Sequence, residues 1–404
     1  PVLLLGDEPV LPYQHPPLSK SWLTAPSDEV APLLIRNAAA YAAAGIETRT
    51  GARVAALDRE RRRLLLESGE ALPYAQLALA TGARARRLGD GVEGAAAAQR
   101  AANVHCLRTL GDAQRLRPQF VPGARIVIVG GGYIGLEIAA LAVRHGLRPT
   151  VLEAQPRVLA RVTAPQMSAF YEGVHRAAGV DVRTGVQVTG FELDATGRVA
   201  ALTWRDVRAG GVSGAGGVGG ASATGRTEAD LVVVGVGVQP NVELAQAAGL
   251  ACADGIVVDE LCRTSDPAIV AAGDCTCRPV PGQVHPVRIE SVPNAVEQAR
   301  TAAATLCGQS LPCLGVPWFW SDQYDLKLQM VGLSQGHDAV AIRGDMAARA
   351  FAAFYLRAGV VIAADVVNRP ADFMLARKLV AARARADAAQ LADRATELKS
   401  LVAA

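Results

Sequence analysis

Residues 126–153 constrain the fold of this chain more than any other segment. They begin with four apolar residues, Ile-Val-Ile-Val, which are typical of a buried parallel strand. A turn containing Gly130, Gly132 and Gly135 follows, and then a helical pattern and a second strand that ends on Glu153. A G-x-G-x-x-G turn between a strand and a helix, with an acid about 20 residues further on, is the sequence pattern of a dinucleotide site.

The glycines and the acid have separate tasks in such a site. Glycine lets the backbone turn tightly and approach a pyrophosphate, whose charge lies at the helix N-terminus. Glu153 is placed to accept hydrogen bonds from ribose hydroxyls, and its charge would repel a 2′-phosphate. The segment therefore predicts binding of NAD rather than NADP. The alternative is a glycine-rich turn that binds nothing.

Length and charge set the broad class. The 404 residues are enough for two or three domains, and a net charge of +3 does not indicate a nucleic-acid partner. Seven scattered cysteines fit a reducing cytoplasm, and no secretory signal or membrane span is recognised. Two basic groups are either solvated faces or docking sites for an acidic partner: Arg84, Arg86 and Arg87, and Arg377, Lys378, Arg383 and Arg385.

The first residues predict a second nucleotide-binding strand. Residues 1–5 are apolar, and Asp7 follows them in the place where such a strand offers an acid to a ribose. No glycine turn precedes this strand. We therefore expect the chain to begin inside a domain, without a strand, glycine turn and helix of roughly 30 residues.

Other strand ends carry small residues that suit a cofactor. Thr81 and Gly82 follow the predicted strand 77–80 and would let the backbone pass close to a ligand. Asp274 follows another small-residue strand and suits hydrogen bonds from sugar-alcohol hydroxyls. A helix begins near Pro293, and its N-terminus would direct its dipole at an electron-rich ring.

The remaining pattern is a series of short elements. Residues 18–23 and 28–44 predict helices, residues 46–80 predict short strands, and the glycine-rich residues 208–226 predict a hairpin excursion without function. A C-terminal α+β domain is expected to contain strands and then helices, at residues 326–333, 338–343, 349–356, 359–366, 370–384 and 387–402.

Several motifs in order resemble one family over essentially the whole chain: GDEPVLPYQHPPLSK, LALATGARARRL, IVIVGGGYIGLEIAA, GVGVQPN, AAGDC, RIESVPNAVEQAR and PWFWSDQYDLKLQMVGL. They resemble the FAD-dependent ferredoxin reductases of bacterial oxygenase systems, within the glutathione-reductase-like flavoproteins. The resemblance implies an α/β fold with two Rossmann-like nucleotide-binding domains, for FAD and NAD, and an α+β C-terminal domain. The expected boundaries are 1–106 with 232–312 for FAD, 107–231 for NAD, and 313–404.

The resemblance also implies an activity. Electrons would pass from NADH through FAD to a [2Fe–2S] ferredoxin, which supplies a cytochrome P-450 or a ring-hydroxylating dioxygenase. The protein would be cytoplasmic, a monomer or weak homodimer, without a membrane or nucleic-acid partner and without a metal site of its own.

Residue roles follow from the resemblance, position by position. Asp7 would bind the FAD adenosine ribose and Val54 the adenine, Arg108 would face the pyrophosphate, Asp274 the ribityl chain and Val292 the flavin. Lys20 would lie beside the isoalloxazine and pair with Glu137. Trp320 would pack by the flavin toward the ferredoxin surface.

Three other activities are compatible with such a fold. A disulfide reductase needs a Cys-x-x-Cys or Cys-x₄-Cys pair. The closest pair here, Cys275 and Cys277, is separated by a single residue and is too tight for either motif. A flavoprotein NADH oxidase of the peroxidase type needs a lone cysteine near the flavin, and Cys106 is the only cysteine before residue 250. A redox-sensing module resembling apoptosis-inducing factor would share both nucleotide-binding halves.

Overall fold

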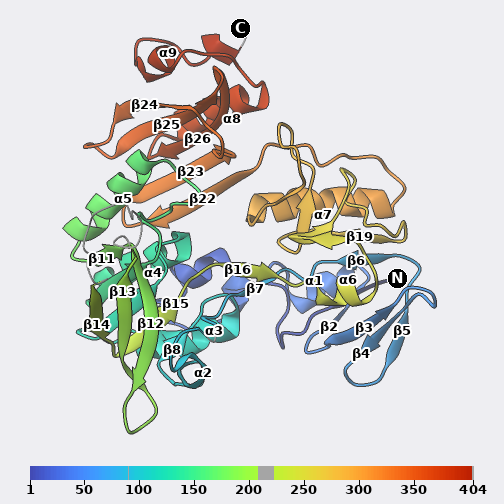
Figure 1. Cartoon of the computed structure of the whole chain (residues 1–404). Coiled ribbons are helices and arrows are strands. Elements are labelled where there is room, and N and C mark those ends of the chain that lie inside the picture. The colour runs from blue at the N-terminus through green and yellow to red at the C-terminus, as the bar shows by residue number, and fades with distance from the viewer. Residues whose placement is uncertain (90, 208–222, 403–404) are drawn as a thin grey trace, which may run out of the picture. The chain divides into compact units, whose positions relative to one another are not determined.

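The computed structural model describes residues 1–89, 91–207 and 223–402 (Figure 1). The chain divides into two compact units. The first contains Pro1–Pro17, Ser27–Arg84 and Gln239–Phe319. The second contains Leu18–Pro26, Ala85–Val238 and Trp320–Ala404.

The second unit is built on a five-stranded parallel sheet. Its order is β11-β10-β9-β15-β8, with β8 Val104–His105, β9 Arg125–Val129, β10 Arg148–Glu153, β11 Asp181–Thr184 and β15 Leu231–Val234. The predicted strand, turn, helix and strand of residues 126–153 are confirmed as β9, α4 (Tyr133–Arg144) and β10. The apolar residues of β9 are buried on both faces, which explains why the run does not alternate.

Further elements complete this part of the second unit. Thr109 and Asp112 form a reciprocal capping box that starts α3 (Leu110–Leu116). The other elements are α2 Ala95–Ala98, η3 Arg117–Gln119, α5 Pro165–Ala177, and an antiparallel sheet of β12 Val186–Leu193, β13 Val199–Asp206 and β14 Thr224–Glu228. Most of the predicted hairpin 208–226 lies outside the described residues, and its last residues belong to β14.

A second, antiparallel sheet contains the C-terminal strands. Its order is β22-β23-β26-β25-β24, with β22 Trp318–Gln323, β23 Leu326–Gly332, β24 Ala339–Asp345, β25 Ala350–Arg357 and β26 Val360–Val367. The helix α8 (Pro370–Ala381) packs against β23 and β26 (Figure 1). The four predicted strands are confirmed, and β22 is an additional strand. The predicted helix 387–402 is wrong in extent, because only α9 Ala388–Ala392 and the 3-10 turn η5 Ser400–Val402 are helical.

The first unit consists of short ladders. Two of its parallel pairs are β1 Val2–Leu5 with β2 Ile46–Arg49, and β6 Leu77–Leu79 with β19 Ile269–Ala271. Its other strands are β3 Val54–Asp58, β4 Arg63–Leu66, β5 Ala71–Pro73, β17 Cys252–Ala253, β18 Gly255–Val257, β20 Thr276–Arg278 and β21 Val287–Arg288. The strands β7 Ala83–Ala85 and β16 Val238–Pro240 pair with each other, and each contains a point where the chain passes from one unit to the other. Its helices are α1 Ala38–Ala43, α6 Glu243–Ala247 and α7 Val292–Leu306.

Two predicted helices near the N-terminus are wrong in extent. Residues 28–44 contain only the 3-10 turn η2 Ala31–Leu33 and α1, and Leu34 between them forms a β-bridge to Tyr13. The α-helix starts late because Asn37 caps it, accepting a hydrogen bond from the Ala40 amide at 2.9 Å. Residues 18–23 contain only the end of the 3-10 helix η1 Pro16–Ser19 and the turns that follow it.

The parallel sheet of the second unit is wider than the expected boundaries allow. Its strands β8 and β15 fall at residues 104–105 and 231–234, within or across the segments assigned to FAD. The sequence does not show which strands pair, so the edge of the sheet formed by β15 and β8 could be located only from the structure. Within the described part of the chain, no helix is long and apolar enough to cross a membrane.

A buried carboxylate lies among tyrosines in the second unit. Asp365 on β26 is 3% exposed and accepts hydrogen bonds from the Tyr355 hydroxyl and from the Thr163 hydroxyl, the latter at 2.7 Å. Burial raises the pKa of Asp365 to about 6. The Asp365 carboxyl group therefore keeps its proton to a higher pH in the folded protein than in the unfolded one.

The variant Asp365→Asn tests this burial. Since the pKa of Asp365 is about 6 in the folded protein and 3.8 in the unfolded one, the wild-type protein loses about 2 kcal/mol of stability as the pH rises from 4 to 7. The variant lacks this loss, so its stability relative to the wild type should rise by that amount over the same range. Denaturant unfolding at several pH values measures the difference, and a constant difference would contradict it.

Candidate functional site

Two glycines of the turn before α4 are required by packing. A side chain on Gly130, where φ is +110°, would place its Cβ 2.3 Å from the Gly235 carbonyl oxygen. A side chain on Gly135 would place its Cβ 2.2 Å from the Gly130 carbonyl oxygen. Neither position accepts any other residue without a shift of backbone.

Gly132 is different. Its φ of −81° is open to every residue, and a Cβ added there would meet no atom within 4 Å. Nothing in the chain therefore requires glycine at this position. The open space lies at the N-terminus of α4, where the helix dipole favours an anionic group.

Glu153 lies at the same turn. Its Oε2 accepts a hydrogen bond from the Gly131 amide at 2.6 Å, and its Oε1 accepts one from the Gln155 amide at 2.6 Å. The last residue of β10 thus places its carboxylate next to the glycine turn, as the sequence predicts. The four residues of the predicted NAD set, Gly130, Gly132, Gly135 and Glu153, come together at one edge of the parallel sheet.

In the first unit, two strand ends lie side by side. The parallel register pairs Leu79 of β6 with Ala271 of β19, so the turns that follow both strands meet at one edge. Gly82 and Gly273 have φ values of +63° and +86°, which favour glycine. The predicted residues Thr81, Gly82 and Asp274 are thereby brought into one neighbourhood.

The helix α7 begins beside these turns. Ser291 caps it by accepting a hydrogen bond from the Asn294 amide at 3.2 Å, and Pro293 lies in its first turn. Gln298, one turn further along α7, accepts a hydrogen bond from the Gly273 amide at 2.9 Å. Val292, the first residue of α7, is 43% exposed.

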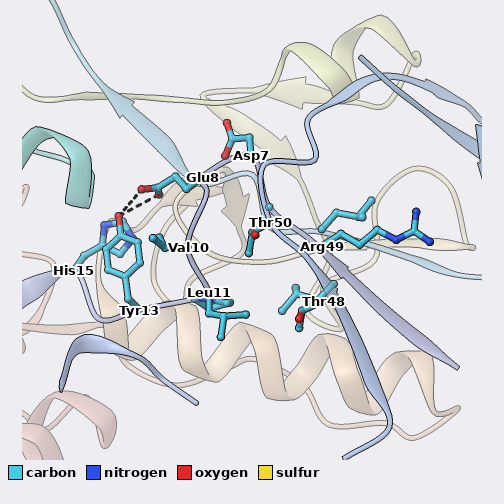
Figure 2. A pocket seen from close by; sticks show the side chains of 13 residues that line it. Asp7, Glu8, Val10, Leu11, Tyr13, His15, Thr48, Arg49 and Thr50 are labelled. Atoms are coloured by element: carbon cyan, nitrogen blue, oxygen red, sulfur yellow. Dashed lines mark hydrogen bonds between the residues drawn. The ribbon is translucent and has the colours of Figure 1, made fainter. Parts of the chain in front are cut away.

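A cavity of about 190 Å³ surrounds Asp7. Figure 2 shows Asp7 and Glu8 after the end of β1, with residues of β2 such as Arg49 opposite them. The Tyr13 hydroxyl donates to the Glu8 carboxylate at 2.8 Å. The carboxylates at a parallel strand end suit a ribose. The predicted adenine contact, Val54, begins β3 and does not line this cavity.

The Lys20 and Glu137 side chains form the predicted pair. Lys20 Nζ lies 2.8 Å from Glu137 Oε2, and the side chains are 21% and 2% exposed. Two hydroxyls also donate to this carboxylate, Ser19 at 2.6 Å and Ser321 at 2.7 Å. Because Glu137 is on α4, the ion pair and the glycine turn share one helix.

Sequence reasoning missed Ser19 and Ser321. Each stands next to a predicted residue, Lys20 and Trp320, but a serine in itself carries no signal for a contact over more than 100 positions. Trp320 is half-buried on β22, directly before Ser321. Arg108 is half-buried, and its amide donates to Asp112 Oδ2 at 3.1 Å as α3 begins.

Cys275 and Cys277, the closest pair of cysteines in the sequence, are both free and buried. Cys275, which follows Asp274, is fully buried, and burial raises the pKa of its thiol, so the thiol stays protonated. Cys106 is half-buried, and burial likewise raises the pKa of its thiol. In the described ranges, no group of three or more His, Cys, Asp or Glu side chains is placed to hold a metal ion.

The second unit contains the glycine turn before α4 with Glu153 beside it, and the first unit contains the adjacent turns after β6 and β19. These features are typical of oxidoreductases that bind two nucleotides. The chain belongs to the pyridine nucleotide-disulphide oxidoreductase family, whose model matches residues 1–299. A second model, described as the reductase C-terminal domain, matches residues 318–402. The predicted fold class is confirmed.

Individual relatives match the whole chain. Putidaredoxin reductase CamA of Pseudomonas putida is 44% identical over 404 residues, which is 100% of this chain and 91% of that protein. Rhodocoxin reductase of Rhodococcus erythropolis is 41% identical over 402 residues, covering 100% of this chain and 88% of that protein. The crystal structure of a covalent putidaredoxin reductase–putidaredoxin complex superimposes with a TM-score of 0.90 at 44% identity, covering 99% of this chain and 91% of the other.

The glycine turn yields a paired prediction. Gly135→Ala should lower the free energy of unfolding by about 3 kcal/mol, because its Cβ would overlap a backbone oxygen. Gly132→Ala should leave unfolding unchanged but weaken NADH binding about tenfold, because its methyl group would occupy the space offered to the pyrophosphate.

Thermal unfolding and NADH titration of both variants separate the two roles. If Gly132→Ala bound NADH as the wild type does, the open space would not be the pyrophosphate site.

Proposed function

We propose that this chain is an NADH-dependent ferredoxin reductase that passes electrons through FAD to a [2Fe–2S] ferredoxin of an oxygenase system. The single observation that carries the proposal is the 44% identity with putidaredoxin reductase along the full 404 residues, including the C-terminal domain. The ferredoxin would supply a cytochrome P-450 or a ring-hydroxylating dioxygenase. Relatives named for dioxygenase systems support the second possibility.

The three-domain division is part of the proposal. We assign the FAD-binding domain to residues 1–106 and 232–312, the NAD-binding domain to 107–231 and the C-terminal domain to 313–404. Because β8 and β15 belong to the five-stranded sheet, the structure favours a longer NAD-binding domain, from about residue 85 to about residue 238, where the compact units separate. We further propose a cytoplasmic protein that is a monomer or weak homodimer.

The residues of the first unit fit FAD. Asp7 lies in a cavity at a strand end, Thr81, Gly82 and Asp274 lie at neighbouring turns, and the exposed residue Val292 starts α7. When bound, FAD accepts a hydride from NADH and releases single electrons. Asp7 would orient the adenosine ribose, Asp274 the ribityl hydroxyls, and Val292 the flavin ring through its amide. The resemblance alone supports Val54 at the adenine.

The residues of the second unit fit NADH and the redox step. Gly130, Gly132 and Gly135 would hold the pyrophosphate at α4, and Glu153 would exchange its contact with the Gly131 amide for the ribose hydroxyls. The family resemblance supports the other roles in this unit. Arg108 would bind the FAD pyrophosphate. Lys20, with its charge fixed by Glu137, would favour negative charge on the ring system beside it.

Trp320 tests the electron path to the ferredoxin. The proposed role needs an aromatic side chain at this position of β22. In an assay with NADH and a [2Fe–2S] ferredoxin of an oxygenase system, Trp320→Ala should slow ferredoxin-dependent cytochrome c reduction about tenfold or more. This factor corresponds to about 1.4 kcal/mol of lost transition-state stabilisation. Trp320→Phe, the matched control, should retain most of the rate.

The proposed function predicts that the yellow flavin protein reduces cytochrome c only when ferredoxin is present. A protein without flavin absorbance, or one that transfers no electrons from NADH to any ferredoxin, would overturn the proposal. Unchanged activity of Trp320→Ala would remove only Trp320 from the path.

A further inference from the structure

The Glu137 carboxylate is the end of a longer hydrogen-bonded series of side chains, which we call the Glu137 network. The series runs through one strand and two helices of the second unit, and it consists of Lys20, Glu137, Ser321, Gln323, His175 and Tyr324. None of the last three residues has a role in the function proposed above.

Every link has hydrogen-bonding distance. Ser321 Oγ lies 2.7 Å from Glu137 Oε1, and Gln323 Nε2 lies 3.2 Å from Ser321 Oγ. His175 Nε2 lies 2.8 Å from Gln323 Oε1. The Tyr324 hydroxyl lies 3.0 Å from His175 Nδ1, so the series continues without a gap from the ion pair to the turn after β22.

The four central members of the network are shielded from water. Ser321 and His175 are 0% exposed, Gln323 is 1% exposed and Glu137 is 3% exposed. Buried polar groups of this kind stabilise a fold only when each has its partner, and a missing partner costs about 1 to 3 kcal/mol. The members therefore depend on one another for their orientation.

The chemistry of the groups fixes the direction of each hydrogen bond. An ionised carboxylate only accepts, so Ser321 donates its proton to Glu137. Ser321 is then free to accept from the amide nitrogen of Gln323, which turns the Gln323 oxygen toward His175. That oxygen requires a proton on His175 Nε2, and His175 Nδ1 is left to accept from Tyr324.

Burial agrees with this assignment. It lowers the pKa of His175, so the imidazole is neutral with a single N–H at neutral pH. It raises the pKa of Tyr324, so the phenol keeps its proton and donates it. All four donors of the series, from Tyr324 to Ser321, thus point along the network toward Glu137.

We propose that His175 and Gln323 are positioning residues of the redox site, which act on Lys20 through Ser321 and Glu137. His175 holds the amide of Gln323 in one of its two orientations, and Gln323 holds the Ser321 hydroxyl toward the carboxylate. Without this alignment Ser321 rotates freely, and Glu137 loses one of the two hydroxyls that fix it against Lys20. The inference rests on the proposed function, because it gives the Lys20 charge its importance.

Four variants test the proposal. Gln323→Leu breaks the network next to Ser321 and should slow flavin reduction by NADH about three- to tenfold, as expected when a charged group loses an aligned partner. His175→Gln keeps a donor at the place of Nε2 and should restore most of the rate that His175→Leu loses. Tyr324→Phe, the matched control, removes only the terminal donor and should change the rate less than about twofold.

A double-variant cycle separates positioning from packing. Anaerobic stopped-flow mixing with NADH, in the absence of ferredoxin, should show the effect of Gln323→Leu in the wild type and none in the Lys20→Met background. An equal slowing in both backgrounds, or a loss of thermal stability without slowing, would make the network a packing contact and overturn the proposal. Flavin reduction that behaves as expected while ferredoxin stays oxidised would contradict the proposed function alone.

The imidazole tautomer gives a second readout that needs no catalysis. In protein labelled with ¹⁵N-histidine, His175 should show a protonated Nε2 and an unprotonated Nδ1 at pH 7, assigned by comparison with His175→Gln. This measurement remains decisive even if Gln323→Leu fails to fold. A proton on Nδ1 alone would reverse the donor order, and a doubly protonated ring would prevent Tyr324 from donating to His175; either result would overturn the proposal.

Discussion

The buried charge of Glu137 is the constraint around which the second unit is arranged. A carboxylate whose side chain is 2% exposed must be paired and hydrogen-bonded, because an uncompensated charge in that position would cost several kcal/mol. Its partners Lys20, Ser19 and Ser321 lie up to 184 positions from Glu137 in the sequence. Satisfying this one group therefore joins an N-terminal turn, the helix α4 and the first strand of the C-terminal sheet.

The helix α4 combines two tasks. Gly130 and Gly132 of the proposed pyrophosphate site precede the helix directly, Gly135 lies in its first turn, and Glu137 follows Gly135 by two positions. The proposed NADH site and the proposed control of the flavin charge thus depend on a single rigid element. The Glu137 network extends the second task to α5 and to β22, the strand that carries Trp320.

The sequence predicted the parts of this arrangement that are local. The glycine turn, β9 and β10 could be recognised because steric overlap demands glycine at 130 and 135, and because a two-sided buried strand is uniformly apolar. Contacts of Ser321 and Gln323 could not be predicted, since nothing in their spacing identifies a partner on another element. The same reason explains the missed strand β22, whose aromatic residues resemble an interface as much as a ladder.

The most direct test of the central claim is anaerobic single-turnover mixing of the flavin-loaded protein with NADH and then with oxidised ferredoxin. The account predicts rapid loss of flavin absorbance with NADH, much slower loss with NADPH, and recovery of the flavin absorbance as the ferredoxin becomes reduced. A flavin that NADH reduces but that stays reduced in the presence of ferredoxin, and reoxidises only when oxygen is admitted, would contradict the account and favour an NADH oxidase.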